Sequence, residues 1–310
     1  MRILVIGSIN RDMTFVLPKA PGEGETVFSR SLAFHPGGKG ANQAVAASRL
    51  GAYTTLIGCV GGDENGHFML QTLRDNRIDT RFLLSTSQPT GLAVVTVDGS
   101  GRNRIVVHSG ANRLVSINTI RSALQSQPWD AVLLQWEIPL EIVFAAIEMA
   151  AELGFLTILD PAPAVPLAGP NLPAGLTVLT PNEHEAEILT GLPAATPQQA
   201  EQAARALSAY AKVVLIKMGE NGALLYTDGQ ATHFGAYPVT PVDTTGAGDA
   251  FTAAFAVRAV QSGDWAEAAR FAAAAGAVST MKEGAQPAMP TLREVQEFIA
   301  PFAQTGGPAS

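Results

Sequence analysis

The chain has 310 residues, of which 47% are hydrophobic and 15% are charged. This balance is typical of a well-packed globular protein and excludes an intrinsically disordered chain. The formal net charge of −7 offers no basic footprint for nucleic acid, because neutralising a phosphate backbone requires clustered Lys and Arg. A small anionic ligand stays compatible, since main-chain amides can bind it.

Cysteine usage and hydropathy indicate where the protein resides. Cys59 is the one cysteine of the sequence, which excludes a disulfide within the chain. No stretch approaches the roughly 18 apolar residues of a membrane helix, and the apolar run near the N-terminus is too short for a signal peptide. We therefore expect a cytoplasmic protein whose partners include neither nucleic acid nor a membrane.

Short apolar runs alternate with helical patterns along most of the chain. Strands are expected at residues 3–6, 54–60, 131–134, 156–159, 176–179 and 213–216. Helices are expected at 41–51, 140–153, 183–189 and about 197–211, with three more between 247 and 300. This alternation predicts an α/β fold, a three-layer α/β/α sandwich around a mostly parallel sheet.

Three short β-type runs break the rhythm, at residues 26–34, 92–97 and 104–108, and a turn at 98–101 joins the last two. They predict a small β-sheet outside the main layers that covers a cleft as a lid, inserted at about 13–35 and 90–108. No linker composition forces a domain boundary. Residues 1–310 are therefore expected to form a single domain, with a disordered tail at 305–310.

Residues 243–251 read D-T-T-G-A-G-D-A-F, a turn of small residues that opens an apolar helix. Gly246, Ala247 and Gly248 let the backbone approach an anion closely, and the unpaired N–H groups of a helix start point at it. Asp249 would stand beside the phosphate and accept the proton of an attacking hydroxyl, as phosphoryl transfer to an alcohol requires. A simple helix-capping loop is the alternative interpretation.

A second glycine turn, G-G-K-G-A-N at 37–42, leads into the helix predicted at 41–51. It is not a P-loop, because Lys39 is followed by Gly40 rather than Ser or Thr, and it is not a dinucleotide fingerprint. Exposed amides, an ammonium group and the carboxamide of Asn42 suit a polyol better. A generic strand-to-helix turn explains the same letters.

Two further polar segments are expected at the carboxyl ends of strands, where α/β sheets bind ligands. Asn10 and Asp12 follow the first strand, and the Asp12 carboxylate could accept hydrogen bonds from two vicinal hydroxyls; an Asx-rich loop is the alternative. Asn182 would cap a helix, and Glu185 in its first turn could hold the water shell of Mg²⁺. An ordinary capping box accounts for that pair equally well. The five histidines show no zinc-ligand spacing.

Taken together and in this order, the motifs resemble the ribokinase family of carbohydrate kinases, the PfkB group, over nearly the whole chain. The matching segments are G-S-I-N-R-D at 7–12, G-G-K-G-A-N-Q-A at 37–44, H-S-G-A-N at 108–112, D-P-A-P-A at 160–164, T-P-N-E-H-E-A-E at 180–187, D-T-T-G-A-G-D at 243–249 and K-E-G-A-Q-P at 282–287. The resemblance implies a ribokinase-like kinase that transfers the γ-phosphate of ATP to the O5 hydroxyl of D-ribose. It also implies Mg²⁺, a monovalent cation expected to be K⁺, and a homodimer formed through the lid sheet.

Carried over residue by residue, the resemblance assigns a role to each part of the site. Asp249 would deprotonate O5, with Gly246, Ala247 and Gly248 as the anion hole for the γ-phosphate. The sugar hydroxyls would be bound by Asn10, Asp12, Gly38, Lys39, Asn42, Glu137 and Asp249. ATP would be bound by Asn182, Lys217, Gly219, Glu220, Gly222 and Gly248, with Ala273 at the adenine. Glu185 would bind Mg²⁺ through water, and the monovalent cation would contact Asp243, Thr245, Ser279, Lys282, Gly284 and Ala288.

Three residues depart from the family pattern. Arg11 replaces a small residue, and its cation at the cleft edge would favour a charged sugar. Ala273 stands where a His or Asn commonly packs on adenine, and Ala288 replaces a Ser.

A kinase of another small sugar, such as deoxyribose or a fructose-like sugar, or of a nucleoside, is an alternative function. For a nucleoside the lid offers only scattered stacking candidates such as Phe28 and Phe34. A non-catalytic sugar-binding protein on this fold is a further alternative, against which the retention of Asp249 and the glycine turn speaks.

Overall fold

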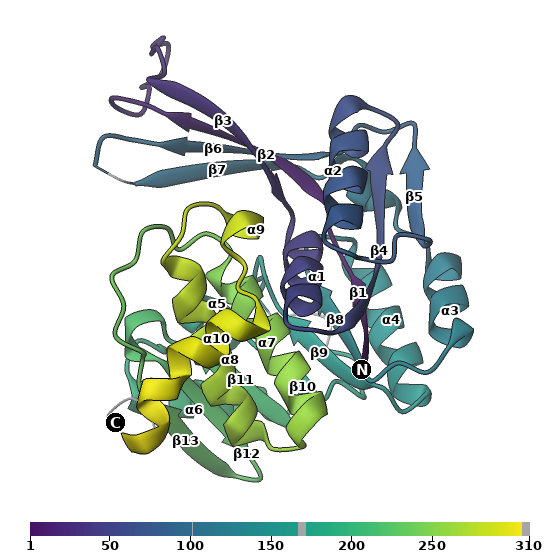
Figure 1. Cartoon of the computed structure of the whole chain (residues 1–310), viewed down its shortest axis with the longest axis vertical. Helices are drawn as coiled ribbons and strands as arrows, with labels where there is room; N and C mark the ends of the chain where they lie inside the picture. The colour runs from purple at the N-terminus through teal and green to yellow at the C-terminus, as the bar shows by residue number, and fades with distance from the viewer. Residues whose placement is uncertain (101, 167–171, 306–310) are drawn as a thin grey trace.

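A computed structural model of the chain describes residues 1–100, 102–166 and 172–305 (Figure 1). Within these residues, the largest element is a nine-stranded sheet in the order β13-β12-β11-β10-β9-β8-β1-β4-β5. Its strands are β1 (Arg2–Ile6), β4 (Tyr53–Gly61), β5 (Leu83–Thr86), β8 (Ala131–Gln135), β9 (Leu156–Asp160), β10 (Val178–Leu179), β11 (Val213–Lys217), β12 (Ala223–Thr227) and β13 (Gln230–Phe234). Neighbouring strands run parallel except where β12 pairs antiparallel with β11 and β13.

Helices cover both faces of this sheet (Figure 1). One face packs on α1 (Lys39–Arg49), α2 (Glu64–Asp75), α7 (Ala247–Ser262), α8 (Trp265–Thr280) and α10 (Leu292–Ile299). The other packs on α3 (Ile117–Ser126), α4 (Leu140–Glu152), α5 (Glu183–Thr190) and α6 (Pro197–Leu207). Because both faces are covered, central strands such as β8 are buried at every residue, which explains their continuous apolar runs. The predicted three-layer sandwich is confirmed.

A separate four-stranded sheet, in the order β3-β2-β6-β7, stands beside the sandwich (Figure 1). Its strands are β2 (Asn10–Val16), β3 (Ser31–Gly37), β6 (Gly91–Val97) and β7 (Asn103–His108). We call it the lid sheet. Strand β2 pairs antiparallel with β3 and parallel with β6. The β-type run expected at 26–34 begins later, at Ser31 of β3, because residues 26–30 form no strand. Residue 101 of the expected turn at 98–101 lies outside the described residues.

Several element boundaries differ from those that the sequence predicts. The segment at 7–12 is a loop only as far as Ile9, and residues 10–12 already belong to β2. The strand expected at 176–179 is reduced to two residues of β10, and the region 247–300 contains α9 (Ala285–Ala288) in addition to α7, α8 and α10. Helices α2 and α3 and strands β5, β12 and β13 were not predicted. The helix expected to about residue 211 ends at Leu207.

The end of the chain is described as far as residue 305. The short 3₁₀ helix η3 (Ala300–Thr305) follows α10, and the remaining residues 306–310 of the predicted disordered tail lie outside the described residues. Between residues 1 and 305, with 101 and 167–171 left aside, no helix combines the length and the apolarity that a bilayer crossing requires.

One carboxylate joins the lid sheet to the sandwich. Asp63 caps α2 by accepting a hydrogen bond from Gly66 N at 2.7 Å. The same side chain accepts hydrogen bonds from Thr90 N at 2.8 Å and Thr90 Oγ1 at 2.6 Å, immediately before β6. Burial opposes ionisation of Asp63, but these hydrogen bonds hold its pKa below the ordinary value. The start of α2, the end of β4 and the base of the lid sheet therefore form one joint.

This joint leaves no room for a side chain at Gly66. A Cβ there would lie 2.0 Å from Gly61 O, whereas a Cβ at neighbouring Gly62 would meet nothing closer than 3.7 Å. We expect Gly66→Ala to destabilise the protein by about 1–3 kcal/mol although Ala is the better helix former, because the backbone must shift. Gly62→Ala should change the free energy of unfolding by less than about 0.5 kcal/mol. Urea denaturation of both variants measures the difference; equal stabilities would contradict the close packing.

Candidate active site

The start of α7 forms the floor of a cleft. Gly246 precedes the helix with a φ of +78°, in the left-handed region, and Asp249 lies in the first turn. A cavity of about 470 Å³ opens over this turn. Its lining includes Lys39, Asn182, Glu185, Lys217, Gly219, Gly246, Gly248 and Asp249. The structure therefore brings residues from both predicted glycine turns and from the predicted ATP groove into one cavity, with the N-terminal end of a 16-residue helix facing it.

Asp249 is 4% exposed, and its two oxygens are held by neighbouring residues of α1. Asn42 Nδ2 donates to Oδ2 at 2.8 Å, and Gln43 Nε2 donates to Oδ1 at 3.2 Å. Burial raises the pKa of Asp249; Lys39 and the Asn42 hydrogen bond lower it, while Asp160 and Glu137 raise it further. A buried carboxylate with a raised pKa is a stronger proton acceptor than a solvated one, as general-base catalysis requires.

A second group of polar residues lies between α1 and the base of the lid sheet. Glu137 accepts hydrogen bonds from Ser8 Oγ at 2.5 Å and from Lys39 N at 3.2 Å. Asn10 Oδ1 accepts from Asn112 Nδ2 at 2.8 Å. Asn10 and Glu137 line a second cavity, of about 550 Å³, so the Lys39 contact to Glu137 links residues of the two cavities.

The glycines of the 37–42 turn permit this close assembly. A Cβ at Gly37 would lie 2.1 Å from Asp12 Oδ2, and a Cβ at Gly38, whose φ is +89°, would lie 2.7 Å from Asn10 N. Only the absence of side chains lets β2 pack onto the turn. The predicted sugar-binding residues Asn10, Asp12 and Gly38 are therefore neighbours.

The charges in this region perturb one another. Burial raises the pKa of Asp12 to about 7, and repulsion from Glu137 and Asp249 adds to the rise, whereas Arg11 opposes it. Burial alone would lower the pKa of Lys39, but attraction by Asp249, Asp160 and Glu137 raises it above its ordinary value. Glu185 attracts the Lys39 ammonium as well, so Lys39 is a permanent cation among four carboxylates.

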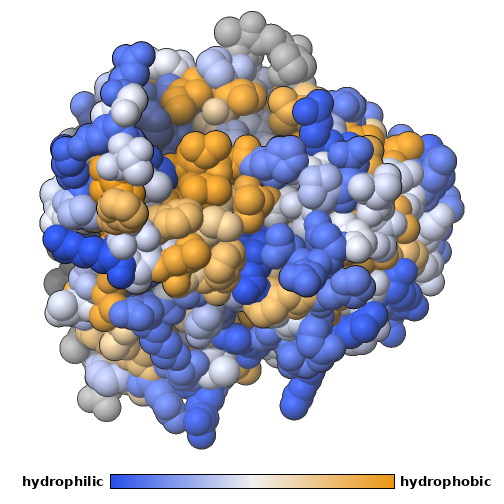
Figure 2. Space-filling view, turned by 90° about the horizontal axis from the view of Figure 1, so that it is seen from above, coloured by the Kyte–Doolittle hydropathy of each residue, from blue (hydrophilic) through white to orange (hydrophobic). Residues whose placement is uncertain are grey.

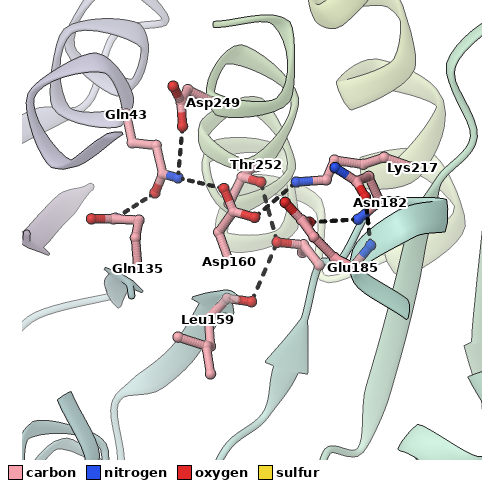
Figure 3. Close-up of polar contacts among 10 residues, drawn as sticks. Gln43, Gln135, Leu159, Asp160, Asn182, Glu185, Lys217, Asp249 and Thr252 are labelled. Atoms are coloured by element: carbon pink, nitrogen blue, oxygen red, sulfur yellow. Dashed lines mark hydrogen bonds and ion pairs between the residues drawn. The ribbon is translucent and has the colours of Figure 1, made fainter. Parts of the chain in front are cut away.

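The opposite wall of the first cavity contains a buried ion pair and a helix cap. Lys217 Nζ lies 2.8 Å from Asp160 Oδ1, and Asp160 is 0% exposed. Asn182 and Glu185 form a complete capping box at the start of α5, with Asn182 N to Glu185 Oε2 at 2.7 Å and Glu185 N to Asn182 Oδ1 at 2.8 Å. Burial raises the pKa of Glu185, and Lys217 opposes that rise. Asn182 and Glu185 therefore cap helix α5 and line the cavity at the same time (Figure 3).

Asp243 ties together two of the loops predicted to bind a monovalent cation. Its carboxylate accepts hydrogen bonds from Thr245 N at 2.9 Å, Thr245 Oγ1 at 2.6 Å and Gly284 N at 2.8 Å. The other side chains predicted for this cation are engaged elsewhere: Ser279 Oγ donates to Gly276 O, and Lys282 pairs with Glu294. Ala288 is fully buried in α9. Lys282 and Ala288 could therefore contribute only main-chain oxygens to a cation, whereas the Ser279 hydroxyl oxygen keeps its lone pairs.

The structure corrects one expectation about the cleft. Alternation along β2 places Arg11 on the opposite face of the lid sheet from Asn10 and Asp12. Its guanidinium carbon lies 3.4 Å from the ring centroid of Phe68 and 5.5 Å from that of Phe34. Arg11 is thus engaged in cation–π contacts away from the sugar-binding residues, which removes the reason to expect a charged sugar.

Three predicted ATP-binding residues, Glu220, Gly222 and Ala273, are absent from the cavity lining. Glu220 is exposed in the 3₁₀ helix η2 (Gly219–Asn221), and Ala273 in α8 packs against the core. Sequence reasoning gave no role to Gln43, Asp160, Ser8 and Asn112, although each lies within a quoted motif and makes a buried polar contact here. Their presence in the family motifs was the signal that could have identified them. Their contacts could not be predicted, because the partners are far apart in sequence: Gln43 and Asp249 are 206 positions apart.

The Lys217–Asp160 pair yields a prediction about stability. Lys217→Met removes the ammonium and leaves a buried carboxylate without its counter-charge, so we expect a loss of about 3–5 kcal/mol in the free energy of unfolding. Adding Asp160→Asn should restore part of that loss, because the uncompensated charge is then gone. Chemical denaturation of the single and double variants at neutral pH measures both values. A loss below about 1 kcal/mol for the single variant would contradict a contribution of this ion pair to stability.

Comparison with known proteins agrees with this geometry. Residues 1–292 match the family described as pfkB family carbohydrate kinase. The chain is 40% identical over 299 residues to ribokinase of Bacillus subtilis strain 168, covering 96% of this chain and 99% of that protein, and 35% identical over 303 residues to deoxyribokinase of Salmonella typhi, covering 97% and 99%. A solved structure of Arabidopsis thaliana ribokinase complexed with ribose and ATP superposes with a TM-score of 0.86 at 34% identity, covering 96% of this chain and 98% of that one. The chain therefore belongs to the pfkB family of carbohydrate kinases.

Proposed function

We propose that this protein transfers the γ-phosphate of ATP to the O5 hydroxyl of D-ribose, giving ADP and D-ribose 5-phosphate. One observation carries the proposal: buried Asp249 lies at the N-terminal end of α7, between the polyol-type turn of α1 and the cavity that Gly246 and Lys217 line. An acceptor hydroxyl and a terminal phosphate can both reach a carboxylate in that position. The ribokinases among its relatives support the same substrates.

In the proposed reaction the sugar O5 attacks the terminal phosphorus in line with the bond to ADP. The O5–H bond breaks as Asp249 takes the proton, the O5–P bond forms, and the bond between phosphorus and the bridging oxygen of ADP breaks. The main-chain amides from Gly246 to Gly248 and the Lys39 ammonium would stabilise the charge on the transferring group. Gly248 lacks a side chain, so nothing of its own stands between the α7 amides and that group.

Two cations complete the proposal. Mg²⁺ accompanies ATP and neutralises phosphate charge. Glu185 would hold it through water, since one Glu185 oxygen is already used by Asn182 N. Among the described residues no group of three or more His, Cys, Asp or Glu side chains could hold a metal, which suits an ion bound mainly by phosphate and water. The carbonyl oxygens of the two loops that Asp243 joins suit a weakly hydrated monovalent cation, K⁺.

The lid sheet would close over the sugar and exclude water, within one kinase domain that works in the cytoplasm. The lid sheet and the loop between β2 and β3 leave large apolar side chains exposed, with Phe28 of the loop at 87% and Val106 of β7 at 71%. Figure 2 looks onto this side of the molecule and shows a broad apolar area bordered by polar side chains. We propose that a second copy of the chain covers it, because apolar areas of this kind mark protein interfaces.

Deoxyribose is the second candidate, because one of the compared relatives is a deoxyribokinase. Asp12 favours ribose. Its carboxylate lies on the same side of β2 as Asn10, and one of its oxygens, Oδ1, is buried with no hydrogen-bond partner among the described residues. A vicinal pair of hydroxyls would provide the missing donors, whereas deoxyribose lacks one of the pair.

The reaction is tested by ADP release from the purified protein with a panel of pentoses, hexoses and nucleosides, with and without K⁺. We expect ribose to give the highest kcat/KM and K⁺ omission to lower kcat. Asp249→Asn should reduce kcat by about 10²–10⁴-fold with a small change in KM, because an amide cannot accept the proton. The matched control is Asp264→Asn at the cap of α8, where Asn serves as well, and activity should be unchanged. No sugar-dependent ADP release, or near-full activity of Asp249→Asn, would overturn the proposal.

The raised pKa of Asp12 predicts how sugar affinity depends on pH. Above about 7 the carboxylate is ionised and accepts hydrogen bonds from the sugar; below it, protonation removes acceptor capacity. We therefore expect KM for ribose to rise as pH falls through about 7. Asp12→Asn should raise KM at every pH and abolish this dependence. Steady-state kinetics over a pH series measures it; a wild-type KM that is flat across this range would refute the assignment of Asp12.

A further inference from the structure

Gln43 lies between two buried carboxylates and contacts both (Figure 3). Its Nε2 donates to Asp249 Oδ1 at 3.2 Å and to Asp160 Oδ2 at 3.0 Å. Gln43 itself is 0% exposed. The two hydrogens of one amide nitrogen thus serve the first turn of α7 and the end of β9 at once. No water can replace this donor without entering the core.

A second amide fixes the orientation of the first. Gln135, the last residue of β8, donates from Nε2 to Gln43 Oε1 at 2.7 Å. A carboxamide has two donor hydrogens on nitrogen and acceptor capacity only on oxygen. If the Gln43 amide turned over, its oxygen would face two carboxylates and its nitrogen would face the donor of Gln135. The two carboxylates and the donor from Gln135 therefore favour the same orientation of Gln43, the one that gives each carboxylate a hydrogen.

The balance of charge around Asp249 makes this donor matter. The acidic and basic groups that face it from the surrounding elements are Asp12 of β2, Lys39 of α1, Glu137 after β8, Asp160 of β9 and, through Asp160, Lys217 of β11. Asp160 repels the charge on Asp249, and burial penalises that charge as well. Hydrogen bonds to the charged form offset both effects. Gln43 is the residue that gives a hydrogen bond to Asp249 and to its repelling neighbour together.

We propose that Gln43 is a positioning residue for phosphoryl transfer, whose carboxamide keeps Asp249 ionised and aimed at the sugar hydroxyl while it separates Asp249 from Asp160. The role rests on the proposed function, in which Asp249 is the base. Gln43 touches neither substrate in this role; it acts through Asp249.

The test compares Gln43→Leu with the wild-type protein. Leu fills a similar volume but donates no hydrogen bond, so Asp249 and Asp160 should repel each other more strongly. The acid limb of the pH profile of kcat should move up by about one to two pH units, because the charged form of Asp249 has lost a donor. At neutral pH we expect kcat to fall about ten- to a hundredfold, with KM for ribose and for ATP within about threefold. Raising the pH should restore much of the lost kcat.

A second readout does not depend on turnover. In protein labelled with ¹³C at aspartate carboxyl carbons, the Asp249 signal is assigned with Asp249→Asn, and its titration midpoint should be higher in Gln43→Leu than in wild type. The proposed kinase function and the positioning role of Gln43 can then be refuted separately. Absence of kinase activity in the wild type refutes the proposed function, whereas an unchanged Asp249 midpoint refutes the role of Gln43 whatever the reaction is.

Two further variants separate positioning from packing. Gln135→Leu leaves Gln43 in place but removes the donor to its oxygen, so the Gln43 amide is held less firmly and the acid limb should shift in the same direction by a smaller amount. This variant also carries the test if Gln43→Leu fails to fold. Thr252→Val removes a buried hydroxyl contact to Thr180, 3.2 Å long and one turn along α7 from Asp249, without touching either carboxylate. It should leave the pH profile unchanged. A pH-independent loss of kcat in Gln43→Leu, matched by Thr252→Val, would overturn the inference.

Discussion

Buried negative charge is the main physical constraint on this site, and the surrounding residues compensate it. Asp12, Glu137, Asp160 and Asp249 lie close enough to repel one another, and burial penalises Asp12 and Asp249 further. The fold meets that cost with one cation on each side of the cleft, Lys39 and Lys217, and with amide donors from α1. The same arrangement that stabilises the charges leaves Asp249 able to accept a proton.

Close backbone packing is what brings these charges together. Gly37, Gly38 and Gly40 lie against residues that precede or begin β2, and a side chain at any of them would collide with backbone or with Asp12. Helix α1 therefore begins directly under the base of the lid sheet, and its first turns face α7. The joint at Asp63 holds that base to the sandwich. Helix α1 in this way contacts both the lid sheet and α7, the helix that carries Asp249.

Part of the site could be read from local sequence, and part could not. The turn that opens α7 and the turn that opens α1 are local features, because glycine, a helix start and a polar residue within a few positions fix their geometry. Arg11 was misplaced because the lid sheet was expected to begin only at about residue 13; β2 begins at Asn10, so strand alternation sends Arg11 to the other face. Helix α2 was missed because its residues 64–75 include Gly66 and have a mixed polar pattern.

The sequence by itself determined the alternation of buried strands and helices along much of the chain, the buried parallel sheet that this alternation implies, and the residues whose chemistry suits a phosphoryl transfer, because each of these depends on neighbours within a few positions. Only the tertiary structure decided which of those residues meet. Gln43 and Asp249 are 206 positions apart, and Lys217 and Asp160 are 57 apart. No local pattern encodes such pairs, because strand order and helix packing, which depend on the whole core, place them in contact.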